Sequence, residues 1–236
     1  MESLLPIKYR DGHVLSAIYL ISSAKARGAI GSSKLHPLAL PRNCGVAVLS
    51  LFDYLDTSIG PYREFSIGVL ATPVPSLPIV IVDALRGNAP VGAWILALPV
   101  TSPLACEGGI EIFGYPKTVQ RIDVQFSNRT CSCVVHDGHD ELVALTCPLR
   151  RGPRFPVNRL LTFTELNGQV MRTDIKTQWR PTISSGRGVR LRLGNQHCPI
   201  VAIAASLELP AEPIFLLHGS GFSATLQVGC PLVVHS

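Results

Sequence analysis

The sequence predicts a mainly β (α+β) fold with many short strands and a few short helices. Apolar or alternating runs are separated by 19 Pro and 20 Gly across 236 residues, and long amphipathic helical patterns are rare. Hydrophobic residues make up 47% of the chain and charged residues 16%, which excludes a disordered chain. Many strands with few helices favour a barrel or sandwich over a βαβ fold. Without an internal repeat or a linker, we expect a single domain over residues 1–236.

Continuous apolar runs predict strands that are buried on both faces. They lie at residues 46–52, 65–70, 78–82 and 91–98. Three further strands are predicted near the C-terminus, at residues 189–193, 200–207 and 214–217.

Two segments show patterns typical of strands with one buried face. In residues 119–126, apolar residues alternate with Arg, Asp and Gln, so the two kinds fall on opposite faces. Residues 131–135 and 141–146 flank an Asp137-Gly138 pair, which predicts a hairpin around that turn.

Helices are predicted at three places. Residues 23–30 follow a serine that can cap a helix, and residues 102–112 also begin at a serine but contain two adjacent glycines. Residues 157–165 are the third candidate.

The charge pattern indicates no nucleic-acid or membrane partner. The net charge of +5 is scattered, and the cluster of Arg150, Arg151 and Arg154 has no interleaved aromatic residues. The uncharged stretches at residues 65–82 and 87–106 contain prolines, which would break a membrane-spanning helix. The chain lacks a basic segment followed by an apolar run at its start, and its seven cysteines are irregularly spaced. We therefore expect reduced thiols and a cytoplasmic location.

Two local patterns imitate binding motifs. Cys131, Cys133, His136 and His139 offer four ligands for zinc within nine residues, but their spacing matches no known zinc motif, so packed cysteines in a hairpin are expected. Residues 219–224 imitate a dinucleotide-binding turn but leave no room for the helix, second strand and acidic residue that such a site needs. We predict neither a metal nor an organic cofactor.

Lys117 lies in an unusually apolar stretch of sequence. A lysine is a nucleophile only when neutral, and an apolar pocket favours the neutral amine by removing the hydration of the ammonium. Apolar residues surround Lys117 on both sides, and Pro116 restricts the backbone that enters it. Taken alone, these residues fit an exposed lysine at a turn better than a nucleophile.

Two motifs give Lys117 a different interpretation. Residues 109–117 (GIEIFGYPK) resemble the motif of the acetoacetate decarboxylase family in which Tyr-Pro-Lys places an imine-forming lysine. Residues 56–64 (DTSIGPYRE) resemble the family's segment ending in Tyr-x-Glu, whose glutamate lines the active site and corresponds to Glu64. A weaker match begins at residues 188–193, so the likeness extends over most of the chain.

The resemblance implies a β-rich double barrel, with the lysine in an apolar cavity, and a homo-oligomer. It implies that Lys117 forms an imine with a substrate ketone and that Glu64 transfers protons. We expect Tyr62, Tyr115 and Phe113 to line the substrate site, with Tyr62 packing rather than reacting.

The sequence departs from the family pattern at three positions. Thr118 stands where the decarboxylase has a second lysine, and neither an arginine near residues 12–13 nor a glutamate near residues 49–50 is present, although Arg10 is close to the first. The departures favour a substrate other than acetoacetate.

The expected activity is that of a carbon–carbon lyase acting on a small keto acid. Decarboxylation of a β-keto acid and aldol or dehydration chemistry both remain open. The alternatives are a non-catalytic, lipocalin-like binder of an apolar ligand and a cyclase or condensing enzyme for a larger, polyketide-like substrate.

Overall fold

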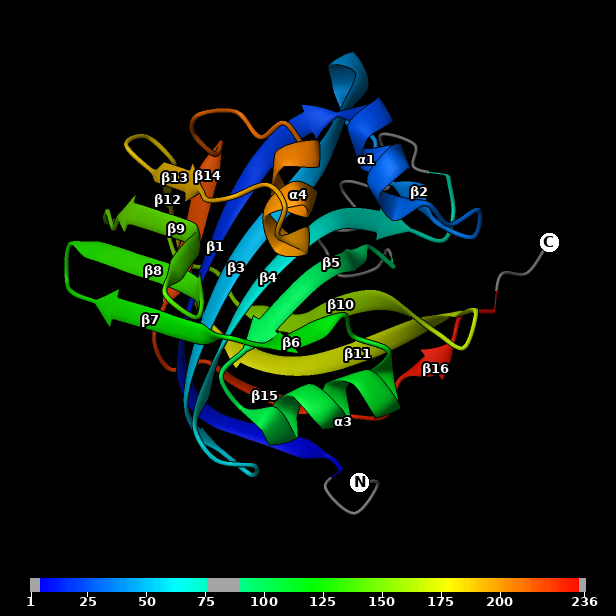
Figure 1. Ribbon diagram of the computed structural model, residues 1–236, viewed down its shortest axis with the longest axis horizontal. Coiled ribbons are helices and arrows are strands. Elements are labelled where there is room, and N and C mark those ends of the chain that lie inside the picture. The colour runs from blue at the N-terminus through cyan, green and yellow to red at the C-terminus, as the bar shows by residue number, and fades with distance from the viewer. Residues whose placement is uncertain (1–4, 76–89, 234–236) are drawn as a thin grey trace.

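The computed structural model describes residues 5–75 and 90–233 (Figure 1). It confirms the predicted class, because the described chain is mainly β with three short α-helices. The helices are α1 (Ser23–Ile30), α3 (Pro103–Phe113) and α4 (Pro199–Ser206). The strands are β1 (Ile7–Ser22), β2 (His36–Pro37), β3 (Cys44–Thr57), β4 (Tyr62–Thr72), β5 (Gly92–Val100), β6 (Lys117–Val119), β7 (Arg121–Phe126), β8 (Thr130–Asp137), β9 (Asp140–Pro148), β10 (Val157–Leu166), β11 (Gln169–Trp179), β12 (Thr182–Ser185), β13 (Arg190–Leu193), β14 (Phe215–Gly219), β15 (Ser223–Leu226) and β16 (Cys230–Pro231).

Seven strands pair in a closed ring. β1 pairs with β3, which is followed around the ring by β4, β5, β10, β11 and β15, and β15 pairs again with β1. The β5–β10 pair is parallel and the others are antiparallel. β12 and β14 extend the large sheet from β1, while β7, β8, β9 and β13 form a separate four-stranded sheet at the left of Figure 1.

Two hydrophobic cores lie on opposite faces of the central strands. In β3, Leu49 and Leu51 pack into the core that also contains the small sheet, whereas Phe52 and Tyr54 face the core inside the ring. β4 alternates in the same way, with Phe65 on one side and Tyr62 on the other. Because successive side chains of a strand point to opposite faces, both faces are buried here. This arrangement confirms that the apolar runs at residues 46–52 and 65–70 are strands buried on both faces.

The structure corrects two predicted elements. Residues 157–165, predicted as a helix, form β10, which pairs along its length with β11. Residues 200–207, predicted as a strand, lie mostly in α4, where Pro199 occupies the first turn and three alanines favour the helix. The predicted strand at residues 78–82 lies outside the described residues.

The predicted hairpin and the alternating strand before it are confirmed. β8 and β9 pair from Thr130 to Asp140 around a turn in which Gly138 has a φ of 56°. Cys131 and Cys133 are buried in the core between the sheets, and burial raises the pKa of the Cys133 thiol to about 12. His136 Nε2 lies 3.0 Å from the Asp123 carboxylate. Within residues 5–75 and 90–233, no group of three or more His, Cys, Asp or Glu side chains is arranged to hold a metal ion.

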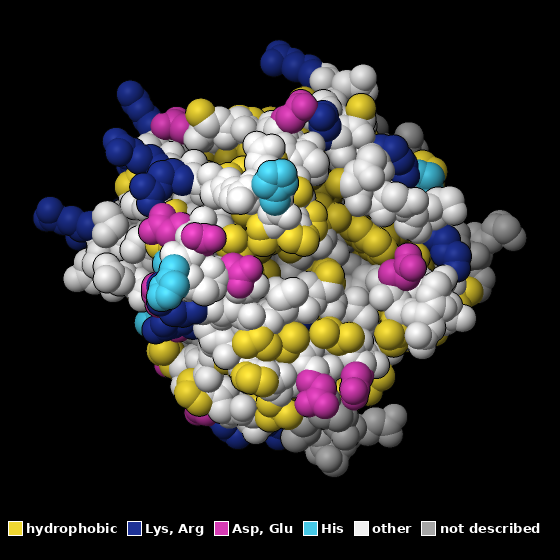
Figure 2. All heavy atoms as spheres, viewed as in Figure 1, with side chains coloured by type: hydrophobic (Ala, Val, Ile, Leu, Met, Phe, Trp, Pro, Cys, Tyr) yellow, Lys and Arg dark blue, Asp and Glu magenta, His cyan; other side chains and the backbone are white. Residues whose placement is uncertain are grey.

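The surface of the face shown in Figure 2 is divided by residue type. Lysine and arginine side chains lie mainly at its periphery, and hydrophobic side chains gather across its middle. The exposed apolar residues include Leu104 and Ile110 on α3. None of the helices in the described part of the chain is long and apolar enough to span a membrane.

Candidate active site

Helix α3 and the turn that follows it position Lys117. Ser102 caps the start of the helix by accepting a hydrogen bond from the Ala105 N–H, and Pro103 occupies the first turn. At the other end Gly114 takes a left-handed conformation with φ of 65°, and its N–H donates to the helix carbonyls. A Cβ at Gly114 would also lie 2.3 Å from the Glu165 carbonyl oxygen, so this position requires glycine on two grounds. The chain then reverses and enters β6 at Lys117.

The lysine side chain crosses over one turn of α3. An ideal Cβ at Gly109 would lie 2.5 Å from Cδ and 2.7 Å from Cε of Lys117. Carbon atoms that are not bonded to each other do not approach this closely. The glycine therefore provides the space through which the lysine stem reaches the interior of the ring.

Glu64 comes from the strand on the other side of β5. Lys117 on β6 lies opposite Leu98 of β5 in a parallel pair, and Glu64 on β4 lies opposite Val100 in an antiparallel pair. Because β4 and β6 pair with the same end of β5, residues that are 53 positions apart in the sequence meet above it.

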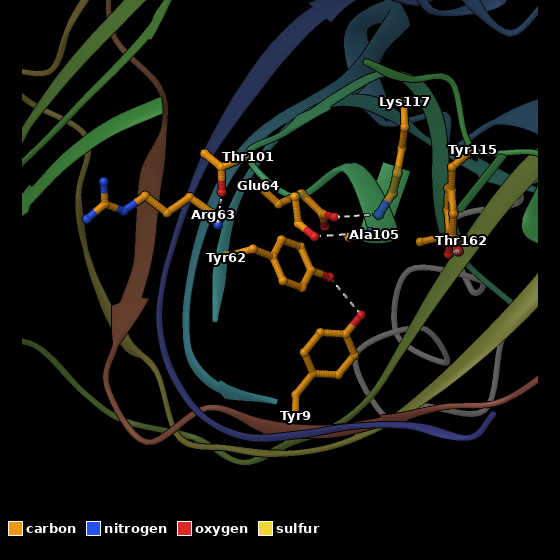
Figure 3. Close-up of polar contacts among 10 residues, drawn as sticks. Tyr9, Tyr62, Arg63, Glu64, Thr101, Ala105, Tyr115, Lys117 and Thr162 are labelled. Atoms are coloured by element: carbon orange, nitrogen blue, oxygen red, sulfur yellow. Dashed lines mark hydrogen bonds and ion pairs between the residues drawn. The ribbon is translucent and has the colours of Figure 1, made fainter. Parts of the chain in front are cut away.

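The two side chains form an ion pair that is almost removed from solvent. Lys117 Nζ donates to Glu64 Oε2 at 2.9 Å, and the side chains are 6% and 10% exposed (Figure 3). Burial of one of these charges alone would cost roughly several kcal/mol, and the opposite charge of the partner offsets part of that cost.

Four tyrosines lie around this pair: Tyr9, Tyr54, Tyr62 and Tyr115. Tyr9 and Tyr62 join their hydroxyl groups at 3.0 Å, and the Tyr115 hydroxyl lies 2.7 Å from Thr162 Oγ1. Nζ of Lys117 lies 5.8 Å from the centre of the Tyr62 ring and 5.6 Å from that of Tyr115, within the range of a cation–π contact.

The phenols remain protonated at neutral pH. Burial raises the pKa of Tyr115 to about 12, and the negative charge of Glu64 adds to the effect. Burial, followed by the same carboxylate, also raises the pKa of Tyr54. The pKa of Tyr9 is raised by the same two causes. These hydroxyls can therefore donate hydrogen bonds but cannot act as bases near pH 7.

A cavity of about 130 Å³ lies inside the ring. Side chains from all seven ring strands line it, together with Tyr115, Lys117 and Phe222. Most are apolar, and the polar groups gather around the ion pair. This cavity is the candidate active site.

The predicted site residues do not all reach this cavity. Lys117, Glu64 and Tyr115 line it. Tyr62 and Phe113 line a smaller space of about 20 Å³ that also touches Lys117. Phe113 is 1% exposed and stacks obliquely on Tyr115 at 5.6 Å, so it supports the site from behind.

The departures from the family pattern have visible consequences. Arg10 points to the surface of β1 and pairs with Asp56 at 2.8 Å, with both side chains 54% exposed. Thr118 is exposed because it follows Lys117 on a strand and points the other way. Arg63 also points away from Glu64 (Figure 3), toward Asp53.

Two tyrosines of the site were not predicted. Tyr9 and Tyr54 enter the cavity from β1 and β3. Each alternates with polar or exposed neighbours in its strand, but no local motif marks it, and only the closure of the ring brings it near Lys117. Cys106 on α3 was missed as well; burial raises the pKa of its thiol, and the positive charge of Lys117 opposes that shift.

The fold and the site together define a β-barrel protein with a buried lysine–glutamate pair in its cavity. The sequence model described as acetoacetate decarboxylase (ADC) matches residues 1–179. The chain therefore belongs to the acetoacetate decarboxylase family, as its motifs predicted.

Solved structures share the fold at low sequence identity. The acetoacetate decarboxylase of Legionella pneumophila superposes with a TM-score of 0.70 at 16% identity, covering 97% of this chain and 87% of that one. The enduracididine biosynthesis enzyme MppR, in complex with pyruvate, gives 0.70 at 12% identity, covering 98% and 91%. An acetoacetate decarboxylase-like enzyme from Sphingomonas wittichii gives 0.64 at 13% identity, covering 97% and 93%. No curated protein sequence matches the chain.

Proposed function

We propose that this protein is a carbon–carbon lyase that acts on a small keto acid through an imine at Lys117. The observation that carries the proposal is the 2.9 Å contact between Lys117 Nζ and the Glu64 carboxylate, inside an apolar cavity. Membership of the acetoacetate decarboxylase family supports it. We also propose that residues 1–236 act as one domain.

Glu64 is assigned the proton transfers. A lysine attacks a carbonyl carbon only as the neutral amine, so a proton must leave Nζ before the bond forms. The Glu64 carboxylate is in hydrogen-bond contact with Nζ and can accept that proton. Loss of the carbonyl oxygen as water then gives the protonated imine.

The protonated imine receives the electrons of the bond that breaks. In decarboxylation of a β-keto acid, carbon dioxide leaves and the electron pair enters the imine to give an enamine. Glu64 takes up a proton from water and delivers it to carbon, and a water molecule then hydrolyses the imine to release the ketone product and the amine. In aldol or dehydration chemistry the same enamine forms when Glu64 removes a proton from the carbon next to the imine.

The hydroxyl groups assist by donating hydrogen bonds. Tyr115 lines the cavity, is held by Thr162, and stays protonated at neutral pH. It is therefore suited to stabilise oxygen as it gains negative charge in the addition step.

The cavity volume favours a small substrate over a polyketide-like one. A cavity of roughly 150 Å³ accommodates benzene, and the volume here is about 130 Å³. The apolar lining also suits the second candidate, a binder that holds an apolar ligand without converting it.

Reductive trapping tests the proposal. The protein is incubated with acetoacetate or pyruvate and sodium borohydride, which reduces an imine to a stable secondary amine, and the modified peptide is identified by mass spectrometry. We expect the adduct on Lys117, its loss in Lys117→Ala, and its retention in the matched variant Lys176→Ala, because Lys176 is exposed on β11. Ligand binding with neither adduct nor turnover would identify the binder instead.

A further inference from the structure

The charged side chains of the cavity lie next to each other. Within the described part of the chain, the charged side chains that line it are Lys117 and Glu64, which neutralise each other. The remaining polar side chains of the lining carry hydroxyl groups, which have no charge. Among the described residues that line the cavity, a charged group of a ligand that lies away from Lys117 therefore meets no counter-charge.

The pleat of β1 excludes Arg10 from the cavity. Tyr9 points into the ring and Arg10 points out, where it binds Asp56. Because the side chains of a strand alternate between faces, Arg10 cannot enter the cavity without a shift of the whole strand by one residue. Such a shift would break the pairing of Tyr9 with Ala224 and Thr57.

Aromatic rings cover part of the cavity. Tyr9, Phe52, Tyr54 and Phe222, which we call the aromatic wall, are in mutual contact: the ring centres are 4.5 Å apart for Tyr9 and Tyr54, 5.5 Å for Phe52 and Tyr54, and 6.0 Å for Phe52 and Phe222. Aliphatic side chains of β5, β10, β11 and β15 also line the cavity. The wall offers contact surface to hydrocarbon and no positive charge.

We infer that the natural substrate is a keto acid with a single carboxylate whose far end is an uncharged, apolar group, and that the aromatic wall binds this group. The inference rests on the proposed imine chemistry at Lys117 and adds the substrate class. A short branched alkyl chain is of suitable bulk, because a cavity somewhat larger, of about 150 Å³, holds benzene. A second carboxylate in that place would be buried without a partner and would lie in the field of Glu64.

Matched substrates of nearly equal shape test the inference. Acetonedicarboxylate and isovalerylacetate differ in having a carboxylate or an isopropyl group at the far end, and α-ketoglutarate and α-ketohexanoate form a second pair. Each is incubated with the wild-type protein and borohydride, and the rate of adduct formation on Lys117 is measured. We expect the apolar member of each pair to react about 100-fold faster, since an unpaired buried carboxylate costs that factor or more.

A cation placed in the wall of the cavity should change this preference. Ile175 on β11 lines the cavity and is half-buried, so Ile175→Arg can supply a counter-charge for a distal carboxylate. We expect this variant to react with acetonedicarboxylate at least tenfold faster than the wild type does. The matched variant Ile183→Arg lies on β12, outside the cavity lining. It should react with acetonedicarboxylate at the wild-type rate.

The outcomes separate the two proposals. Equal rates for both members of each pair in the wild type would overturn the inference and leave the imine chemistry intact. Absence of an adduct from all four compounds would overturn the proposed function itself. The wild-type comparison decides the inference even if Ile175→Arg does not fold.

Discussion

The stem of Lys117 crosses helix α3 at Gly109, where an added methyl group would lie 2.5 Å from Cδ of the lysine. This close approach links a helix that is largely apolar to the residue on which the chemistry is proposed to depend. It also makes a glycine, which carries no functional group, a determinant of the site.

Replacement of Gly109 by alanine should displace the lysine. We expect Gly109→Ala to slow borohydride trapping on Lys117 at least tenfold, because Nζ can no longer hold its place beside Glu64 while the methyl group occupies the path of the stem. The control is Gly28→Ala in α1, where a Cβ meets nothing within 4 Å. That variant should trap at the wild-type rate and gain up to about 1 kcal/mol of stability from the better helix former. Equal trapping in the two variants would contradict the role given to Gly109.

The buried ion pair should show strong coupling in a double-mutant cycle. Lys117→Met leaves the Glu64 carboxylate buried without a partner, and Glu64→Gln does the same to the ammonium, so each should lower the free energy of unfolding by about 3–5 kcal/mol. The double variant should lose much less than the sum of the two. Urea denaturation of the four proteins measures the coupling. Additive effects would mean that the two charges do not interact in solution.

The tyrosines should resist ionisation in the folded protein. Burial raises the pKa of all five tyrosines of the chain, that of Tyr115 to about 12. Unfolded tyrosines ionise near pH 10, so above that pH the unfolded chain binds fewer protons than the folded one. The stabilising contribution is therefore complete below about pH 10 and is lost as the pH rises toward the folded values.

A spectrophotometric titration checks this behaviour. The phenolate absorbance of the native protein should remain flat at pH 10 and then rise together with the loss of circular dichroism, whereas the protein in guanidinium chloride should titrate near pH 10. A native protein in which two or more tyrosines ionise at pH 10 would show that the cavity is open to solvent.

A second lysine next to the first should have little effect. Thr118 is exposed and points away from the cavity, so a cation there is separated from Nζ by the strand and is screened by water. We expect Thr118→Lys to leave both the rate and the pH dependence of trapping unchanged. A shift of the pH profile toward lower pH by one unit or more would instead show that the adjacent charge reaches Lys117.

The sequence predicted elements correctly where a local pattern identifies them, and it assigned the wrong structure to two segments that a local pattern does not decide. Continuous apolar runs and the Asp137-Gly138 turn identified β3, β4, β5 and the β8–β9 hairpin correctly. Residues 157–165 were assigned the wrong structure because their burial depends on pairing with β11, which a local pattern does not reveal. Residues 200–207 were predicted as a strand and lie mostly in a helix, because a short apolar run fits a buried helix as well as a strand.

The order of residues along the chain determined the Tyr-Pro-Lys and Tyr-x-Glu motifs, and with them the family to which this protein belongs. A motif of this kind is a local property, so the sequence by itself was enough to single out Lys117 and Glu64. Only the tertiary structure decided that they are in contact, because β4 and β6 both pair with the same end of β5. Closure of the ring between β1 and β15 placed Tyr9 inside and Arg10 outside, since the register of β1, rather than residue type, decides which side chain faces the cavity. The lysine that the sequence singled out thus acquired its partner and its apolar surroundings from long-range strand pairing.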